Sequence, residues 1–225
     1  MKRRAFISLL GGAVAAWPLA ARAQQPAMPV IGLLNPLAPG SSGRLLDAFR
    51  RGIAESGYVE GRNVAIEYRL AGGFDRLSEL ARGLVRSRVS VIAASGGEAA
   101  VAAKAATPTI PIAFIVPEDP VKLGLVASLA HPGGNATGLN FFTAEVNAKR
   151  LGLLRELVPA AARVAVLINP SNATNTSSML AELEPAARAL GLQIQTFKRR
   201  DQSEPSRRQH DPVWGAALLI SAPAP

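Results

Sequence analysis

The sequence predicts an α/β fold built on mainly parallel sheets. Two observations carry this prediction: short, unbroken apolar segments recur along the chain, and segments with helical periodicity alternate with them. Short apolar runs of this kind are typical of strands that are buried on both faces of a parallel sheet. With 225 residues, of which 48% are hydrophobic and 18% charged, the chain has enough apolar side chains to bury a sizeable core.

Two strand–helix pairs are expected at the start of this pattern. A continuous apolar run at 30–34 predicts a strand, and apolar residues at helical spacing predict a helix over 43–56. A second strand at 63–69 alternates apolar and polar side chains, and a helix over 75–86 carries four large aliphatic residues. This order predicts strands that lie parallel, with right-handed crossovers.

The alternation continues through the middle of the chain. A strand at 89–94 leads through Ser-Gly-Gly into an alanine-rich helix that ends at Ala106, and 110–116 is the next strand. Asp-Pro opens a helix expected over 119–130, and a Pro-Gly-Gly-Asn turn follows it. The segment 136–142 is expected to be a strand that leaves this first unit.

A second, smaller α/β unit is predicted next. A helix over 144–157 and a strand at 163–169 begin it, and a helix over 174–190 and a strand at 192–197 continue it. The same strand–helix alternation therefore predicts a second parallel sheet.

The expected domains are an N-terminal lobe over 24–140, a partial second lobe over 141–197 and a divergent tail over 198–225. Residues 198–212 contain no aliphatic or aromatic side chain apart from two prolines, so a helix there has no face to bury. Residues 213–221 again predict a buried strand. This sudden loss of periodicity suggests the hypothesis that 198–212 arose by a frameshift and that the gene is truncated.

The first 23 residues have the three parts of a secretory signal peptide. Residues 2–4 are basic, 5–20 form an apolar run, and Ala21-Arg22-Ala23 is a small-x-small cleavage signal. Cleavage after Ala23 is expected, and an uncleaved anchor is the alternative. The paired arginines at 3 and 4 resemble a twin-arginine export signal, and the Sec route remains open.

The net charge of +9 does not predict nucleic-acid binding. Four of the 25 basic residues lie in the signal segment, several lie in the tail, and the others are interspersed with the acidic residues. This mixture is typical of a solvated surface, and 5% aromatic residues offer no stacking platform for bases.

Cysteine and histidine usage excludes several chemistries. The sequence has no cysteine, so disulfides, thiolate metal sites, a cysteine nucleophile and a lipid-modified cysteine are excluded. His131 and His210 are its two histidines, and we therefore expect no metal site, no cofactor and no catalytic residues.

Five segments together form a specific family pattern: Trp17–Gln25; Gly57–Gly61 with Asn63 and Ile66–Arg69; Asp119–Val121 with Gly124–Val126; Pro132–Gly138; and Lys149–Leu151 with Leu153–Pro159. The pattern resembles bacterial ABC transporter substrate-binding proteins with the type I periplasmic-binding fold, from the signal through about Phe197. The resemblance implies two lobes with Rossmann-like sheets, the second incomplete, that close on a small, amino-acid-like solute.

The same resemblance implies a non-enzymatic protein of the periplasm. It would deliver its solute to a membrane permease with an ATPase subunit, and it would meet the membrane only through that permease. Two alternatives remain open: a truncated paralogue that no longer binds a solute, and an exported α/β hydrolase.

Candidate ligand-binding residues follow from the rule that open parallel sheets bind ligands beyond the carboxyl ends of their strands. They lie in the loops after four predicted strands: Asn35, Ser41 and Ser42; Ser95, Gly96 and Gly97; Asp119; and Asn169, Ser171 and Asn172.

Each of these loops also has a structural interpretation. Ser95–Gly97 can present free N–H groups to a carboxylate or can simply cap a helix. Asp119 can pair with an ammonium group or cap a helix, and its neighbour Glu118 stands where many family members have glycine. The 169–172 loop can face the solute or form a turn and cap. For the aromatic pair 141–142, packing in the core is favoured over stacking on a solute.

Overall fold

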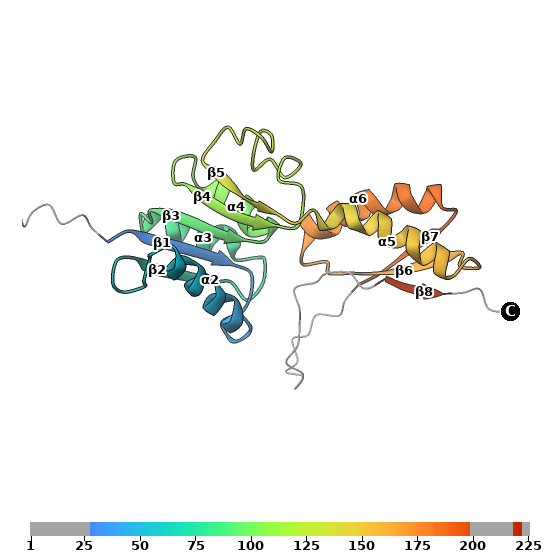
Figure 1. Ribbon diagram of the computed structural model, residues 1–225, viewed down its shortest axis with the longest axis horizontal. Helices are drawn as coiled ribbons and strands as arrows, with labels where there is room; N and C mark the ends of the chain where they lie inside the picture. Colours follow the sequence, from blue (N-terminus) through green and yellow to red (C-terminus); the bar gives the residue numbers. More distant parts are fainter. Residues whose placement is uncertain (1–27, 199–217, 222–225) are drawn as a thin grey trace, which may run out of the picture.

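The computed structural model describes residues 28–198 and 218–221, which form two α/β lobes (Figure 1). The predicted signal peptide lies outside the described residues, and so does most of the predicted tail. The frameshift hypothesis concerns 198–212, of which the structure describes only Lys198. The α/β prediction is confirmed, with a five-stranded sheet in the first lobe and a three-stranded sheet in the second.

The first lobe contains five parallel strands in the order β2-β1-β3-β4-β5. The strands are β1 (Val30–Asn35), β2 (Ala65–Leu70), β3 (Val91–Ser95), β4 (Ile112–Val116) and β5 (Ala136–Asn140). The helices are the short 3₁₀ helix η1 (Pro39–Ser41), α2 (Gly43–Glu55), α3 (Leu77–Arg86) and α4 (Gly97–Ala106). This is a doubly wound order, and it reverses direction between β1 and β3.

A single apolar core holds the first lobe together. The large buried side chains come from the central strands and from α3, and they include Leu34, Leu84, Ile92 and Ile112. Helix α3 packs so closely on β1 that a Cβ atom at Gly32 would lie 2.7 Å from the Leu84 side chain. Because Gly32 has no side chain, α3 can pack closely on the sheet at this point.

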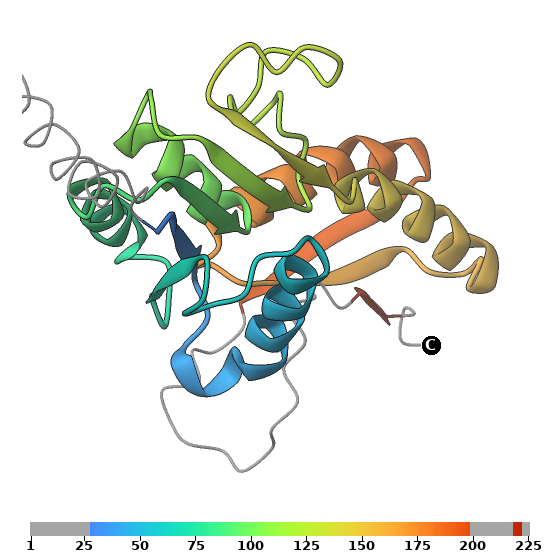
Figure 2. The same cartoon turned by 60° about the vertical axis from the view of Figure 1, so that its left-hand side comes forward.

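The second lobe has its own sheet and its own core. It comprises α5 (Thr143–Leu157), β6 (Arg163–Ile168), α6 (Ala173–Ala189), β7 (Gln193–Lys198) and β8 (Leu218–Ser221). Helices α5 and α6 lie side by side on the same face of this sheet in both views (Figures 1 and 2). Leu151, Val166, Met179 and Leu183 fill the space between the helices and the sheet.

Strand β8 departs from the parallel pattern. Strands β6 and β7 are parallel, as the sequence predicts, but β8 pairs antiparallel with β6. A strand was expected over 213–221, and its described part, Leu218–Ser221, is confirmed as a strand.

The helix predicted over 119–130 is wrong. The N–H groups of Leu123 and Leu125 do bond back to the carbonyls of Asp119 and Pro120, which makes one helix-like turn. Gly124 then adopts a φ of +70°, which ends the turn, and the chain continues as turns and bends. The Asp-Pro pair therefore begins a single turn, and no helix follows that turn.

The last strand of the first lobe also ends earlier than predicted. Strand β5 stops at Asn140, and Phe142 has a left-handed backbone with a φ of +49°. The Asn140 side chain donates to the carbonyl of Glu118 and accepts from the N–H of Phe142. These bonds turn the chain sharply into α5 at the passage between the lobes.

Candidate ligand-binding cleft between the lobes

The carboxyl ends of β3 and β4 lie at the edge of the first-lobe sheet that meets α6 of the second lobe. In the strand order, β3 lies between β1 and β4. Helix α4 follows β3 in the chain and contacts α6 of the second lobe. Ligands of doubly wound sheets bind beyond the carboxyl ends, near the reversal of strand order. The junction of the two lobes is therefore the place to look for a site.

The predicted residues after β1 are held in local hydrogen bonds. Asn35 is 1% exposed, and its Oδ1 accepts from the N–H of Leu37 at 2.7 Å. Ser42 is fully buried and donates to the carbonyl of Pro39, while the exposed Ser41 donates to Ala38. These bonds shape the loop between β1 and α2.

The Ser-Gly-Gly segment turns β3 into α4. Gly96 has a φ of +93°, a backbone conformation that favours glycine, and occupies the N-cap position without a side chain. The next residue, Gly97, is buried, and a Cβ atom there would lie 2.7 Å from Glu118 Oε2 and 3.1 Å from Thr174 Cγ2. The start of α4 is thus closely covered from both lobes.

Glu118 is the most unusual side chain at this junction. It is 2% exposed, and its Oε1 accepts a hydrogen bond from Asn175 Nδ2 of α6 at 3.3 Å. Its other oxygen, Oε2, is buried and has no partner among the described residues. Burial raises the pKa of Glu118, and the nearby Glu98 carboxylate raises it further. Hydrogen bonds from the backbone N–H of Glu118 and from the Asn175 side chain act in the opposite direction, but the pKa remains raised.

A second carboxylate from the first lobe reaches the start of α6. Glu98 Oε1 accepts from the N–H of Thr174 at 2.8 Å, so Glu98 satisfies one of the free donors at that helix N-terminus. A negative charge at a helix N-terminus is also favoured by the helix dipole. Glu98 and Glu118 therefore both bind the first turn of α6 across the junction.

In the second lobe, the predicted residues 169–172 form a turn and a cap. Asn172 Oδ1 accepts from the N–H of Asn175 at 2.9 Å, which is a helix N-cap bond. Asn169 Oδ1 accepts from the N–H of Ser171 at 3.2 Å, and Ser171 is exposed. The structural interpretation of this loop is confirmed, and the loop positions the α6 turn that meets Glu98 and Glu118.

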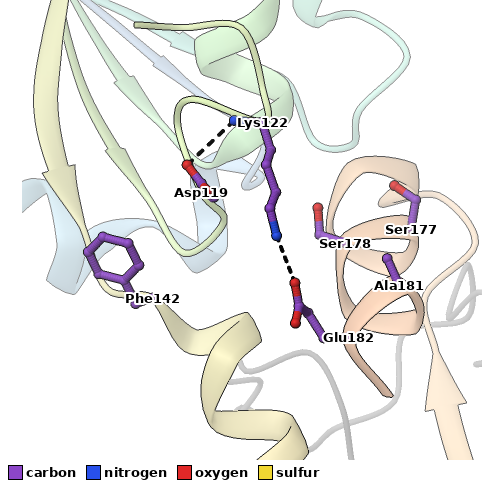
Figure 3. Close-up of a pocket in the computed structure, with 7 residues that line it drawn as sticks. All are labelled: Asp119, Lys122, Phe142, Ser177, Ser178, Ala181 and Glu182. Atoms are coloured by element: carbon purple, nitrogen blue, oxygen red, sulfur yellow. Dashed lines mark hydrogen bonds and ion pairs between the residues drawn. The ribbon is translucent and has the colours of Figure 1, made fainter. Parts of the chain in front are cut away.

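A pocket of about 280 Å³ lies beside these contacts and is lined from both lobes (Figure 3). Lys122 Nζ and Glu182 Oε1 form an ion pair of 2.8 Å across it. Asp119 Oδ1 accepts from the N–H groups of Val121 and Lys122, so Asp119 caps a turn and not the predicted helix. The residues that line the pocket are Asp119, Lys122, Phe142, Ser177, Ser178, Ala181 and Glu182.

The aromatic pair at the passage between the lobes does not pack in the core as expected. Phe141 is 56% exposed, and Phe142 lines the pocket with a half-buried ring. The predicted strand continued to Phe142, but the chain turns sharply after Asn140, and this turn carries both rings away from the core.

Sequence reasoning missed most of the contacts between the lobes. Glu98 and Thr174 lie 76 residues apart in the sequence, and Glu118 and Asn175 lie 57 apart. No local pattern predicts which of these side chains meet. The available signal was the charge of Glu118, which stands in the loop directly after a predicted strand.

Residues 28–198 and 218–221 contain no cluster of three or more His, Cys, Asp or Glu side chains that could hold a metal ion. Within the same ranges, no helix combines the length and apolar character needed to cross a bilayer.

Two α/β lobes with a pocket lined from both define a class of protein that encloses a small molecule by hinged closure. Within that class, the chain belongs to the family of ABC transporter substrate binding proteins, whose family model matches residues 31–207. This is a family of substrate-binding proteins and not of enzymes.

Individual relatives agree with this assignment. A tyrosine-binding protein of Clostridioides difficile is 33% identical over 124 residues, which are 55% of this chain and 35% of that protein. A conserved domain protein of Vibrio cholerae has a similar structure, with a TM-score of 0.65 and 26% identity over 76% of this chain. An ABC domain from Streptococcus pneumoniae in complex with L-Trp shares the fold, with a TM-score of 0.63 and 24% identity over 77% of this chain.

The chain spans only part of each of these relatives. It covers 57% of the Vibrio cholerae structure and 58% of the Streptococcus pneumoniae structure, besides 35% of the Clostridioides difficile protein.

Proposed function

We propose that this protein is the periplasmic solute-binding component of an ABC transporter, and that it captures a small, amino-acid-like solute between its two lobes. The observation that carries the proposal is the pocket of about 280 Å³, to which the first lobe contributes Asp119 and the second lobe contributes Ser178 and Glu182. A pocket lined from both lobes gives a solute contacts that exist only when the lobes are closed.

The relatives support an amino-acid-like solute. One is called a tyrosine-binding protein, and another was solved in complex with L-Trp. The pocket offers matching chemistry, because Asp119 and Glu182 can attract an ammonium group, Ser177 and Ser178 provide hydroxyls, and Phe142 provides an aromatic face. We keep as further candidates for the solute site the positions predicted from the loop rule: Asn35, Ser41, Ser42, Ser95, Gly96, Gly97, Asn169, Ser171 and Asn172.

A solute screen tests this function. Purified protein is titrated with amino acids and their amines, and binding is followed by thermal shift and calorimetry. Asp119→Asn keeps a capping oxygen but removes the charge, so we expect it to weaken binding of an ammonium-bearing solute roughly tenfold or more. Glu79→Gln, at an exposed position of α3, is the matched control.

Two results would count against the proposal. Unchanged affinity in Asp119→Asn would remove Asp119 from the site. A protein that melts cooperatively but responds to no solute of this class would contradict the binding function itself.

We also propose that the protein is exported and passes its solute to a permease with an ATPase subunit. The signal-like residues 1–23 support export, and the family supports the transporter partner. The mature protein recovered from the periplasm is expected to begin at Gln24, which N-terminal sequencing measures directly. Replacing both arginines 3 and 4 with lysine separates the two export routes, because the twin-arginine route depends on that pair.

A further inference from the structure

The Glu118 carboxylate at the junction of the lobes lacks a hydrogen-bond donor. Among the described residues, Glu118 Oε2 is the one buried side-chain oxygen or nitrogen without a partner. A buried polar group without a partner is costly, and an ionised carboxylate more so, unless a donor or a cation compensates it. The position of this oxygen between the two lobes therefore points to a partner supplied from outside the chain.

The surroundings of Glu118 favour a cationic partner. Glu98 is the nearby charged group, and it has the same sign. Neither Glu98 nor Glu118 takes part in an ion pair within residues 28–198. Asn175 donates to Oε1, and Oε2 receives no hydrogen bond from the described residues. A protonated amine supplies both the hydrogen bonds and the positive charge that this pair of carboxylates lacks.

The same geometry disfavours a solute carboxylate at the start of α4. Free N–H groups at a helix N-terminus ordinarily attract an anion. Here Glu118 Oε2 already lies against Gly97, at the first position of α4, and Glu98 follows it in the chain. A third carboxylate in this place would meet two like charges in a region shielded from water.

We propose that Glu118 is a specificity-determining residue, which selects a solute with a protonated amine and rejects one whose carboxylate would bind at the start of α4. Oε2 of Glu118 accepts a hydrogen bond from the ammonium group, and the body of the solute lies in the neighbouring pocket. Asn175, which bonds to Glu118, and the pocket residues Ser178 and Glu182 follow one another at helical spacing on the same face of α6, so the pocket lies beside this carboxylate. This inference rests on the proposed solute-binding function.

The test compares solutes that differ by one carboxylate. The pairs are L-tyrosine with tyramine, L-tryptophan with tryptamine, and L-leucine with 3-methylbutylamine, each titrated into the purified protein by calorimetry. In at least one pair the amine is expected to bind tenfold or more tightly than the amino acid. Glu118→Gln keeps the shape but removes the charge, and it is expected to lose that preference. Glu118→Gly removes the side chain, and it is expected to gain affinity for the amino acid.

Control measurements keep the outcome interpretable. Glu79→Gln removes an exposed negative charge from α3 and is expected to keep the preference of the unaltered protein. Thermal melts of each variant establish that it is folded before it is titrated.

The results separate the two proposals. If the unaltered protein binds an amino acid more tightly than its amine, or if Glu118→Gln keeps the amine preference, the inference is overturned and the solute-binding function stands. If folded protein and folded variants bind neither member of any pair, both the inference and the amino-acid-like solute are overturned.

Discussion

The Glu118 carboxylate is buried, and its Oε2 atom has no hydrogen-bond partner among the described residues. Leaving such a group without a partner costs about 1–3 kcal/mol in typical cases. The chain retains this cost at the place where its lobes meet, although a glycine at the same position would avoid it. A residue that weakens the folded protein at the proposed binding cleft is better explained by ligand selection than by folding.

The raised pKa of Glu118 predicts a specific dependence of stability on pH. A carboxyl group whose pKa is higher in the folded chain contributes stability below its ordinary pKa, and that contribution is lost as the pH rises through the raised value. Glu118→Gln should therefore be more stable than the unaltered protein at pH 7, by about 1 kcal/mol or roughly 2–4 °C in melting temperature. The advantage should shrink at pH 4.

Melting curves from pH 4 to pH 8 for both proteins measure this difference. Glu79→Gln controls for the loss of one surface charge. A difference between Glu118→Gln and the unaltered protein that does not change with pH would contradict the assignment of the titrating group.

Residue roles could be predicted only where they are local. The capping interpretation of Asn172 followed from its neighbours in the sequence and is confirmed by a hydrogen bond three residues away. Asp119 accepts a similar local bond, but it caps a turn and not a helix. The burial of Glu118 could not be predicted, because it depends on α6, more than fifty residues further along the chain.

At the scale of elements, α4 begins where no side chain fits. A Cβ atom at Gly97 would lie 2.7 Å from the buried Glu118 carboxylate and 3.1 Å from Thr174 Cγ2. We expect Gly97→Ala to destabilise the protein by about 1–3 kcal/mol through overpacking. Combining it with Glu118→Gly should recover more than half of that loss, because the closest contact is then absent.

Denaturant unfolding of the two single variants and the double variant measures this coupling. Gly152→Ala is the matched control, since a Cβ atom at this position of α5 meets nothing within 4 Å. Alanine there is expected to stabilise the helix by about 0.5–1 kcal/mol. Additive effects of Gly97→Ala and Glu118→Gly would show that the two residues are not in contact.

Most elements could be predicted because periodicity is a local property. The alternation of apolar runs and amphipathic segments gives every described strand and most of the helices to within a few residues. The exception, 119–130, begins with a good helix signal but contains Gly124 in a left-handed conformation. A start signal alone does not determine how far a helix continues.

At the scale of the whole molecule, most side-chain bonds between the lobes come from α6, besides the bond from Thr143 to the carbonyl of Pro117 at the passage between the lobes. Thr174, Asn175 and Glu182 of α6 bond to Glu98, Glu118 and Lys122 of the first lobe, respectively. The exposed pair between Lys122 and Glu182 contributes little, typically below about 1 kcal/mol. The closed arrangement therefore depends chiefly on the first turn of α6.

Asn175→Asp tests this dependence. It places a carboxylate where an amide now donates to Glu118, so the lobes should separate at pH 7 and close again when the carboxyls are protonated near pH 4. Small-angle scattering should show a larger radius of gyration at pH 7 for this variant. Gln195→Glu, which adds the same charge on the exposed β7 strand, should scatter as the unaltered protein does. Equal scattering for Asn175→Asp would contradict the role of this contact.

The two-lobed arrangement could be predicted from family resemblance, but its contacts could not. Composition and periodicity give two α/β units and the edge of each sheet where a ligand binds. Which side chains meet across the junction depends on the angle between the lobes, which the turn at Asn140 and Phe142 sets.

The contribution of the second lobe to the cleft comes almost entirely from one face of α6. Apart from Phe142 and Thr143 at the passage into α5, the residues that bond to the first lobe or line the pocket from this side lie between positions 174 and 182, which is about two and a half helical turns. A segment this short can be exchanged between relatives without altering the buried side of the helix, which Met179, Leu183 and Ala187 anchor. At the proposed site, solute preference can therefore be altered by changes to a single helical surface while both hydrophobic cores stay the same.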